Sequence, residues 1–145
     1  MKRIHPPDVY VADTRTARGR GVFAGRAFRK GEVVEVAPVI VLENREVELI
    51  GNTVLRTYDF DWRVLAGTGH PATAIAGGYG SLYNHSNPAN LRYRADPDTP
   101  ALVFTAVRAI ECGEELTINY NARGGGAAWH DDNWFEQEGV MREGD

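Results

Sequence analysis

The sequence predicts a mainly β protein with little helix, folded as one domain. The 145 residues are 43% hydrophobic and 25% charged, which is typical of a single globular domain of ordinary size. The 16 glycines and 7 prolines indicate frequent turns and therefore short strands. Runs rich in β-branched residues lie between these turns, and neither an internal repeat nor a long linker divides the chain.

The first part of the chain is predicted to form short strands joined by glycine turns. Runs 9–12 and 21–24 are rich in residues that favour strands. Gly31 suits a tight turn, because glycine adopts positive φ without steric cost. The run 33–42 is interrupted by Pro38, which predicts either two strands that meet at a kink or an edge strand with a bulge.

One short helix is expected next, followed by another strand. Asn44 is a suitable N-cap for a helix over 45–50, in which Val47 and Ile50 share one face. The side chains of 53–62 alternate in character along the chain, which predicts a half-buried strand.

The second half is predicted to contain an antiparallel pair and a final strand. The runs 91–95 and 101–110 flank a turn over 96–100, as in a β-hairpin. A second turn at Cys112 and Gly113 leads into the last strand. Three glycines at 124–126 then mark a joint, so we expect a domain over 1–123 and an aromatic, acidic tail over 124–145.

The charge distribution limits the classes of partner. A formal net charge of −4 argues against a general nucleic-acid binder. Residues 1–30 carry eight Lys or Arg, whereas residues 131–145 carry six acids and one Arg. The acidic tail is either a solvated face or a surface that attracts a basic substrate segment.

Cysteine and histidine usage argues against a disulfide or a metal centre. Cys112 is the only cysteine, which excludes an intramolecular disulfide and a zinc cluster of several cysteines. The four histidines lie far apart without ligand spacing, so no metal site is predicted. The N-terminus has no apolar signal-like segment, and no run is long enough for a membrane span. We therefore expect a cytoplasmic protein without membrane contact.

Three short motifs carry candidate chemistry, although each is weak alone. "GRG" at 19–21 lacks the third glycine of a dinucleotide-binding loop and suits an ordinary turn. "GEEL" at 113–116 is common in surface hairpins. "NHS" at 84–86 fits a nucleophile site, a metal site or a polar turn around a hydrogen-bonded His85.

In their order along the chain, these segments resemble the SET-domain protein lysine methyltransferase family. "RGRGVFAGRAFRKGE" resembles the opening glycine strand and "GE" turn of that family, and "TYDFDW" resembles its "TYLFDLD"-type strand. "YGSLYNHSNPAN" resembles the segment with the "NHSCxPN" motif, and "GEELTINYN" resembles "GEELTFDYN". The resemblance runs from about Arg18 to Asn121.

The resemblance implies a fold and a reaction. The fold would consist of several small curved β-sheets, with a knot-like crossing of the "NHS" segment and the last strand near the C-terminus. The reaction would transfer a methyl group from S-adenosylmethionine to a lysine amine of a protein or peptide, leaving S-adenosylhomocysteine. The chain lacks the cysteine-rich zinc-binding flanks of many members. We therefore expect a small, free-standing enzyme, either a monomer or a homodimer, that needs neither metal nor nucleic acid.

The resemblance also implies roles for individual residues. Tyr120 matches the catalytic tyrosine, which orients the methyl group and the amine. Expected cofactor contacts are Tyr58, Asn84, His85, Trp134 and a backbone cradle formed by Gly19, Arg20 and Gly21. A nearby arginine is expected to pair with the carboxylate of the cofactor. The lysine channel is expected to include Tyr83, Ile118 and Phe135. Trp134 and Phe135 lie in the tail, which either closes the active site as a flap or packs on the core.

Departures from the family pattern leave other readings open. Asn87 replaces the usual cysteine, Ala37 stands where an aromatic residue is usual, and Ile118 replaces Phe or Tyr. One alternative is therefore a catalytically weak or inactive SET module that binds a peptide or protein partner. A structural or sugar-binding β-domain and a hydrolase using Cys112 and His85 are further alternatives; no activating partner for Cys112 is assignable from the sequence.

Overall fold

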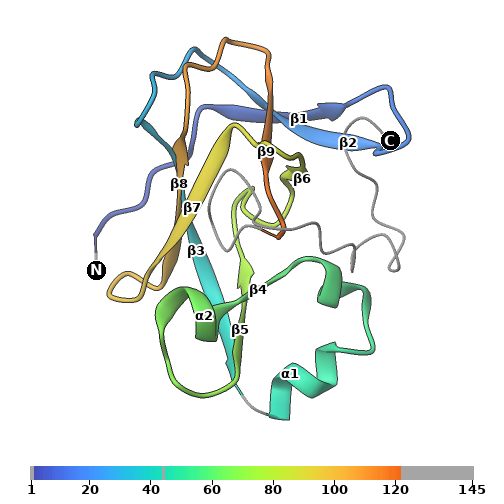
Figure 1. Ribbon diagram of the computed structural model, residues 1–145, viewed down its shortest axis with the longest axis vertical. Helices are drawn as coiled ribbons and strands as arrows, with labels where there is room; N and C mark the ends of the chain where they lie inside the picture. Colours follow the sequence, from blue (N-terminus) through green and yellow to red (C-terminus); the bar gives the residue numbers. More distant parts are fainter. Residues whose placement is uncertain (1, 44, 122–145) are drawn as a thin grey trace.

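The computed structural model describes residues 2–43 and 45–121, and these form two β-sheets with two short α-helices and one 3₁₀-helix (Figure 1). The mainly β prediction is thus confirmed. In chain order the elements are β1 (Val9–Asp13), β2 (Arg20–Ala24), β3 (Val33–Glu43), α1 (Arg45–Ile50), the 3₁₀-helix η1 (Val54–Thr57), β4 (Asp59–Asp61), α2 (Trp62–Ala66), β5 (Ala72–Ala76), β6 (Asn84–His85), β7 (Leu91–Asp96), β8 (Ala101–Ala106) and β9 (Glu115–Ile118).

The smaller sheet has the strand order β1-β2-β9-β6. Its strands pair antiparallel except for β6 and β9, which run parallel with Asn84 opposite Thr117 and His85 opposite Ile118. This parallel pair places the "NHS" segment directly beside the last strand, as a crossing of these two segments requires. The predicted last strand and the turn before it, where Gly113 has φ +86°, are confirmed.

The larger sheet has the order β4-β5-β3-β8-β7, so β3 lies in its centre. The prediction for 33–42 is confirmed in part: a change at Pro38 and a bulge are both present, but one continuous strand replaces the two predicted strands, and it does not lie at the edge. The single strand instead changes partner at Pro38: residues 33–38 pair with β8 and residues 39–43 pair with β5. A proline lacks the N–H that a central strand needs, and the change of partner accommodates that loss. A bulge occurs nearer the start, between Val33 and Glu35.

The prediction of one strand over 53–62 is also wrong. Side-chain capping divides this segment into η1, the short β4 and the start of α2. The Thr53 hydroxyl accepts from the Leu55 N–H at 3.3 Å, and the Asp61 carboxylate accepts from the Val64 N–H at 3.2 Å. Each cap satisfies a helix N–H that has no partner within the helix, and these local bonds outweigh the apparent alternation.

Other predicted elements are present. Strands β7 and β8 form the expected hairpin, with Leu91 opposite Ala106 and Asp96 opposite Ala101. Helix α1 has the expected bounds, although its predicted cap Asn44 lies outside the described residues. Gly31 has φ +84° in its turn. Strand β5 was not predicted.

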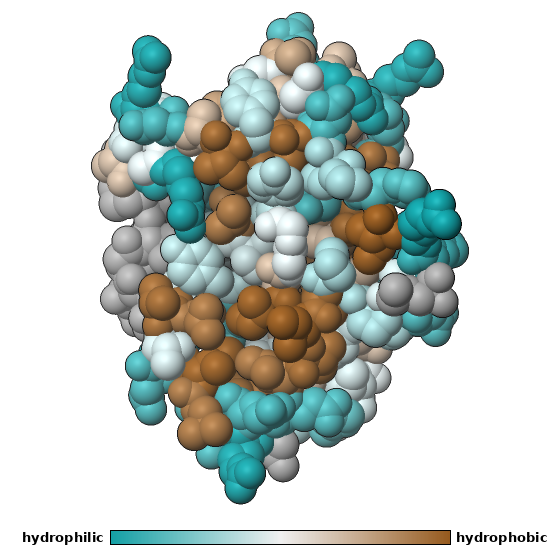
Figure 2. Space-filling model, turned by 180° about the vertical axis from the view of Figure 1, so that it is seen from behind, coloured by the Kyte–Doolittle hydropathy of each residue, from teal (hydrophilic) through white to brown (hydrophobic). Residues whose placement is uncertain are grey.

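The core lies between the sheets and is both aliphatic and aromatic. Phe104 is fully buried at its centre, with ring centroids at 4.8 Å from Tyr83, 5.6 Å from Tyr93 and 6.4 Å from Phe60. Seen from behind, apolar side chains also gather over the lower half of the surface (Figure 2). Within the described residues, no helix combines the length and apolar character needed to cross a membrane.

Candidate functional site

A cavity of about 430 Å³ lies where residues of the two sheets meet. Its aromatic lining comes from widely separated parts of the chain: Tyr58, Phe60, Tyr83, Tyr93 and Tyr120. Ile118 of β9 contributes an aliphatic side chain, and Asp59, Asp61 and Arg63 contribute charge. We refer to this cavity as the aromatic pocket.

Tyr120 is anchored in the pocket at two points. Its hydroxyl donates to the main-chain carbonyl of Tyr83 at 2.8 Å, and its backbone N–H donates to Nδ1 of His85 at 3.1 Å. Burial raises the pKa of the Tyr120 hydroxyl above its usual value of 10. The hydroxyl therefore stays protonated at physiological pH, and its position is defined by the Tyr83 carbonyl.

A second cluster of polar groups lies beside the pocket, around Asn84. The Asn84 Nδ2 donates to the Arg20 carbonyl at 2.9 Å and to Glu115 Oε1 at 2.8 Å. Gly21 has no space for a side chain, because a Cβ there would collide with the Glu115 carboxylate and lie 3.1 Å from the Asn84 Nδ2. Gly19 has φ +75° and open space beside its Cα. We call Gly19, Gly21, Asn84 and Glu115, with Arg18, the polar cradle.

Arg18 is the buried cation of this cradle. Its Nη2 lies 2.5 Å from Glu115 Oε2, and only 10% of its side chain is exposed. Its Nη1 is buried without a hydrogen-bond partner among the described residues. A buried, unsatisfied guanidinium nitrogen is costly and fits an anionic ligand that completes its hydrogen bonds.

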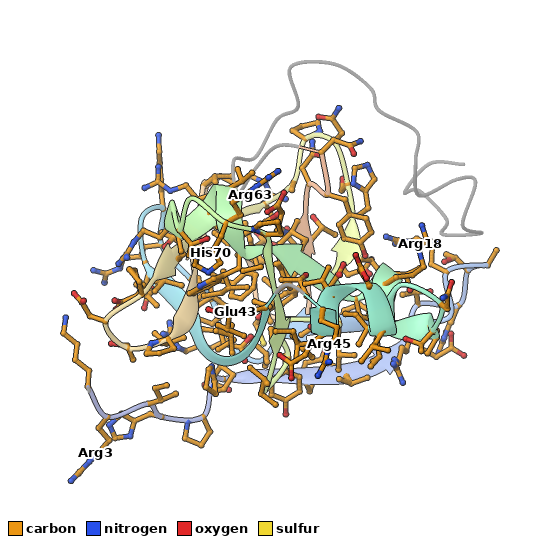
Figure 3. All side chains as sticks on the ribbon, turned by 90° about the horizontal axis from the view of Figure 1, so that it is seen from below. Arg3, Arg18, Glu43, Arg45, Arg63 and His70 are labelled. Carbon is orange, nitrogen blue, oxygen red and sulfur yellow. The ribbon has the colours of Figure 1, made fainter. Side chains whose placement is uncertain are left out.

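Arg20 was expected to contribute its backbone to a cofactor cradle, whereas the arginine for the cofactor's carboxylate was predicted only as one nearby. The Arg20 side chain is exposed, and its contact with Asn84 is made by its main-chain carbonyl. The sequence did not distinguish Arg18 from Arg20 for that pairing, because both arginines stand next to the same glycine. Figure 3 shows Arg18 well separated from Arg63, the arginine that lines the aromatic pocket.

Three consecutive residues join the pocket to the cradle. The Tyr83 carbonyl faces Tyr120, the Asn84 side chain lies in the cradle, and the His85 ring accepts from the Tyr120 backbone.

The side chain of Asn90 holds the neighbouring strand β9 in register. Its Nδ2 donates to the Glu115 carbonyl and its Oδ1 accepts from the Thr117 N–H, both at 2.8 Å.

The structure thus brings together most of the residues named from the sequence. Tyr58, Tyr83, Ile118 and Tyr120 line the pocket, and Gly19, Gly21 and Asn84 belong to the cradle. Trp134, Phe135 and the proposed flap over 124–145 lie outside the described residues. Whether each of these residues contacts a ligand stays a prediction.

Sequence reasoning missed Tyr93 and the acidic residues of the pocket. Asp59 and Asp61 flank Phe60 within the "TYDFDW" segment, so the motif itself contained this signal. Burial raises the pKa of Asp59, although a hydrogen bond from the Thr73 hydroxyl at 2.9 Å partly opposes this effect. Tyr93 lies on β7 opposite Phe104, and nothing in its local sequence indicated a site.

The other candidate chemistry finds no support. Cys112 is exposed, whereas His85 is 2% exposed and its Nδ1 accepts from the Tyr120 backbone. Across residues 2–43 and 45–121, no group of three or more His, Cys, Asp or Glu side chains is arranged to hold a metal ion.

Comparisons with known proteins identify a matching family, related sequences and a shared fold. The family model described as SET domain matches residues 19–121. Histone-lysine N-methyltransferase, H3 lysine-37 specific, of Schizosaccharomyces pombe is 30% identical over 129 residues, which are 88% of this chain and 77% of that protein. N-lysine methyltransferase KMT5A-A of Xenopus laevis is 31% identical over 117 residues, which are 74% of this chain but only 35% of the longer frog protein. The Neurospora SET domain protein DIM-5, a histone lysine methyltransferase, shares the fold with a TM-score of 0.65 at 21% identity, covering 81% of this chain and 54% of that one.

Proposed function

The chain belongs to the SET-domain family of protein lysine N-methyltransferases, and on this basis we propose that it transfers a methyl group from S-adenosylmethionine to a lysine side chain of a protein substrate. The observation that carries this proposal is the position of Tyr120. Its hydroxyl lies in the aromatic pocket, while the neighbouring residues Tyr83 to His85 link it to the polar cradle. A tyrosine in this position can orient two reactants that enter from the two sides.

The polar cradle fits the amino-acid end of the methyl donor. The unsatisfied Arg18 Nη1 suits a carboxylate, because charge-assisted hydrogen bonds to guanidinium groups are strong. Glu115 and the side-chain carbonyl of Asn84 suit an ammonium group. The open space beside Gly19 allows a ligand to approach the main chain closely. When bound, S-adenosylmethionine supplies an electrophilic methyl group on a sulfonium.

The aromatic pocket fits a lysine side chain. Tyr58, Tyr93 and Tyr120 offer faces along which an alkyl chain and its amine can lie. The carboxylates of Asp59 and Asp61 attract a lysine ammonium, but they also oppose loss of its proton. A free lysine has a pKa near 10.4, so deprotonation at pH 7 costs on the order of 4–5 kcal/mol. The apolar part of the pocket, with Ile118 and Phe60, lowers that cost because it disfavours the charged form.

The role of Tyr120 is to orient and not to react. Its hydroxyl hydrogen points to the Tyr83 carbonyl, which fixes the direction of the oxygen lone pairs. A fixed oxygen next to the amine and the methyl carbon favours a near-attack arrangement. Because burial raises its pKa, the Tyr120 hydroxyl stays protonated. It therefore does not act as the base that takes up the proton of the lysine.

A catalytically inactive module that binds a peptide is the second candidate. The observation that favours it is the position of Ala37, which is fully buried. The Ala37 side chain packs against Gly80 so closely that a Cβ added to Gly80 would lie 2.9 Å from the Ala37 Cβ. That position therefore adds no aromatic wall to the pocket. Tyr58 and Tyr93 supply such walls from other elements, and for this reason we favour the active enzyme.

The test combines binding with mapping of the product. The purified chain is titrated calorimetrically with S-adenosylmethionine, and it is then incubated with methyl-labelled cofactor and either histones or a cell lysate. Histones are included because the fission yeast relative is named for a lysine of histone H3. Label at the Nζ of lysine supports the proposal. Cofactor binding without any labelled lysine favours the inactive module, and label on another residue type contradicts lysine methylation.

A further inference from the structure

A carboxylate lies buried in the centre of the larger sheet. Glu35 of β3 is 3% exposed, and its buried neighbours on the strand include Val34 and Ala37. Burial raises the pKa of Glu35 above its usual value of 4.5. A buried carboxylate costs free energy unless it is hydrogen-bonded, and an apolar residue would suit the core better. The contacts of Glu35 therefore indicate what it is needed for.

Both oxygens of Glu35 bind the segment that connects β5 to β6. Oε1 accepts from the Tyr83 hydroxyl at 2.7 Å, and Oε2 accepts from the Tyr79 N–H at 2.9 Å. The turn is built around this carboxylate: Gly78 has φ +56°, and a Cβ there would lie 2.5 Å from Oε2. Glu35 thus holds the segment at its start and at its end.

Tyr83 connects this anchor to the pocket. Its side chain is 1% exposed, with its hydroxyl on Glu35 and its ring 4.8 Å from the ring of Phe104. Its main-chain carbonyl accepts the hydroxyl of Tyr120 at 2.8 Å. With the side chain fixed at both ring and hydroxyl, the carbonyl has little freedom to move. A single residue therefore links Glu35 to Tyr120.

We propose that Glu35 is a positioning residue for methyl transfer: it holds Tyr83 so that the Tyr83 carbonyl orients the Tyr120 hydroxyl. This inference rests on the proposed function. It differs from a purely structural role, in which loss of Glu35 would lower stability but leave turnover per folded molecule unchanged. A positioning role lowers kcat while cofactor affinity is kept, because the ground-state contacts of the cradle are intact.

Four variants separate these roles. Glu35→Gln keeps the shape of the side chain but turns an amide NH₂ toward one of the two donors, and Tyr83→Phe removes only the hydroxyl. Each is expected to lower kcat about tenfold, because small displacements of an orienting group are costly, with cofactor affinity unchanged within about twofold. The double variant is expected to be within about twofold of the worse single variant, because both changes break the same link. Val34→Ala, a buried change on the same strand, is the control and is expected to keep kcat per folded molecule.

A spectroscopic measurement tests the link without turnover. With ¹³Cζ-labelled tyrosine, the Tyr120 resonance is assigned by its absence in Tyr120→Phe. It is expected to shift in Glu35→Gln and in Tyr83→Phe but not in Val34→Ala. An unchanged Tyr120 resonance, or a normal kcat in Glu35→Gln, overturns the positioning role. Failure of the wild-type protein to methylate any lysine would instead refute the proposed function, and the resonance would still report on the link.

Discussion

The backbone N–H of Tyr120 donates to Nδ1 of His85, with the rings of the two residues 5.2 Å apart. His85 is buried on β6. By accepting the Tyr120 N–H, its ring fixes the chain just after the last strand. Among the described residues, this histidine has the surroundings of a hydrogen-bond acceptor and not those of a nucleophile or a metal ligand. It links the backbone of Tyr120 to the segment that carries the polar cradle.

Replacing this acceptor is expected to destabilise the protein. His85→Phe keeps an aromatic ring but removes the acceptor of this part-buried hydrogen bond, which costs roughly 1–3 kcal/mol. Denaturant unfolding measures the change in the free energy of unfolding. His5→Phe at an exposed histidine is the control, with an expected change within about 0.5 kcal/mol. Equal effects of the two changes would show that the bond to Tyr120 contributes nothing.

Arg18 is expected to bind the carboxylate of the methyl donor. Arg18→Met should weaken S-adenosylmethionine binding about 10- to 100-fold, the usual range for a lost hydrogen bond to a charged group. An analogue without the carboxylate should bind the variant and the wild type equally well. Arg20→Met is the matched control, since that side chain is exposed. Calorimetry that finds the larger loss in Arg20→Met would assign the carboxylate to Arg20.

Glu35 is expected to make stability fall as the pH rises. Its pKa is raised in the folded state, so above pH 4.5 the unfolded chain loses this proton first. Relative to Glu35→Gln, the wild-type free energy of unfolding should therefore decrease with pH from about pH 4.5 and level off above the folded-state pKa.

Glu114 provides a control of opposite sign for this pH dependence. A hydrogen bond from Arg108 lowers the pKa of Glu114, so its contribution is present above pH 4.5 and is lost as the pH falls. Unfolding curves of Glu35→Gln and Glu114→Gln against pH should thus differ from wild type with opposite slopes. Parallel slopes would contradict the burial of an ionisable Glu35.

Local signals predicted the parts of the fold that local bonds determine. The β7–β8 hairpin and the turn before β9 have turn residues between the predicted strand segments, and both were predicted. The segment 53–62 was misjudged because its two caps, Thr53 and Asp61, were given less weight than its alternation. Pro38 suggested an edge strand. The change of partner that places Pro38 inside the sheet depends on β5 and β8, which lie far along the chain, and the local sequence therefore did not indicate it.

The candidate site was predictable only where a motif carried it. The order of the motifs along the chain predicted that Gly21, Asn84 and Tyr120 belong to one site. The pairing of β6 with β9 places the segments that carry Asn84 and Tyr120 side by side, and Asn84 lies close to Gly21. Glu35 lies 48 positions before the tyrosine that it binds, and no local pattern indicates such a pair. Tyr93 was missed for the same reason: it lines the pocket only because of how β7 packs with other strands, and its local sequence does not show this.

Methyl transfer by the wild type and by Tyr120→Phe, measured with the substrate lysine identified by mapping, tests the central claim most directly. Tyr120→Phe should bind S-adenosylmethionine within a few-fold of the wild type but lose about 100-fold in methyl transfer, a loss comparable to removing one preorganised hydrogen-bonding group at an active site. Tyr10→Phe, at a partly exposed tyrosine on the outer strand β1, should transfer at the wild-type rate. Equal transfer by Tyr120→Phe and the wild type would contradict the role of the Tyr120 hydroxyl on which this account depends.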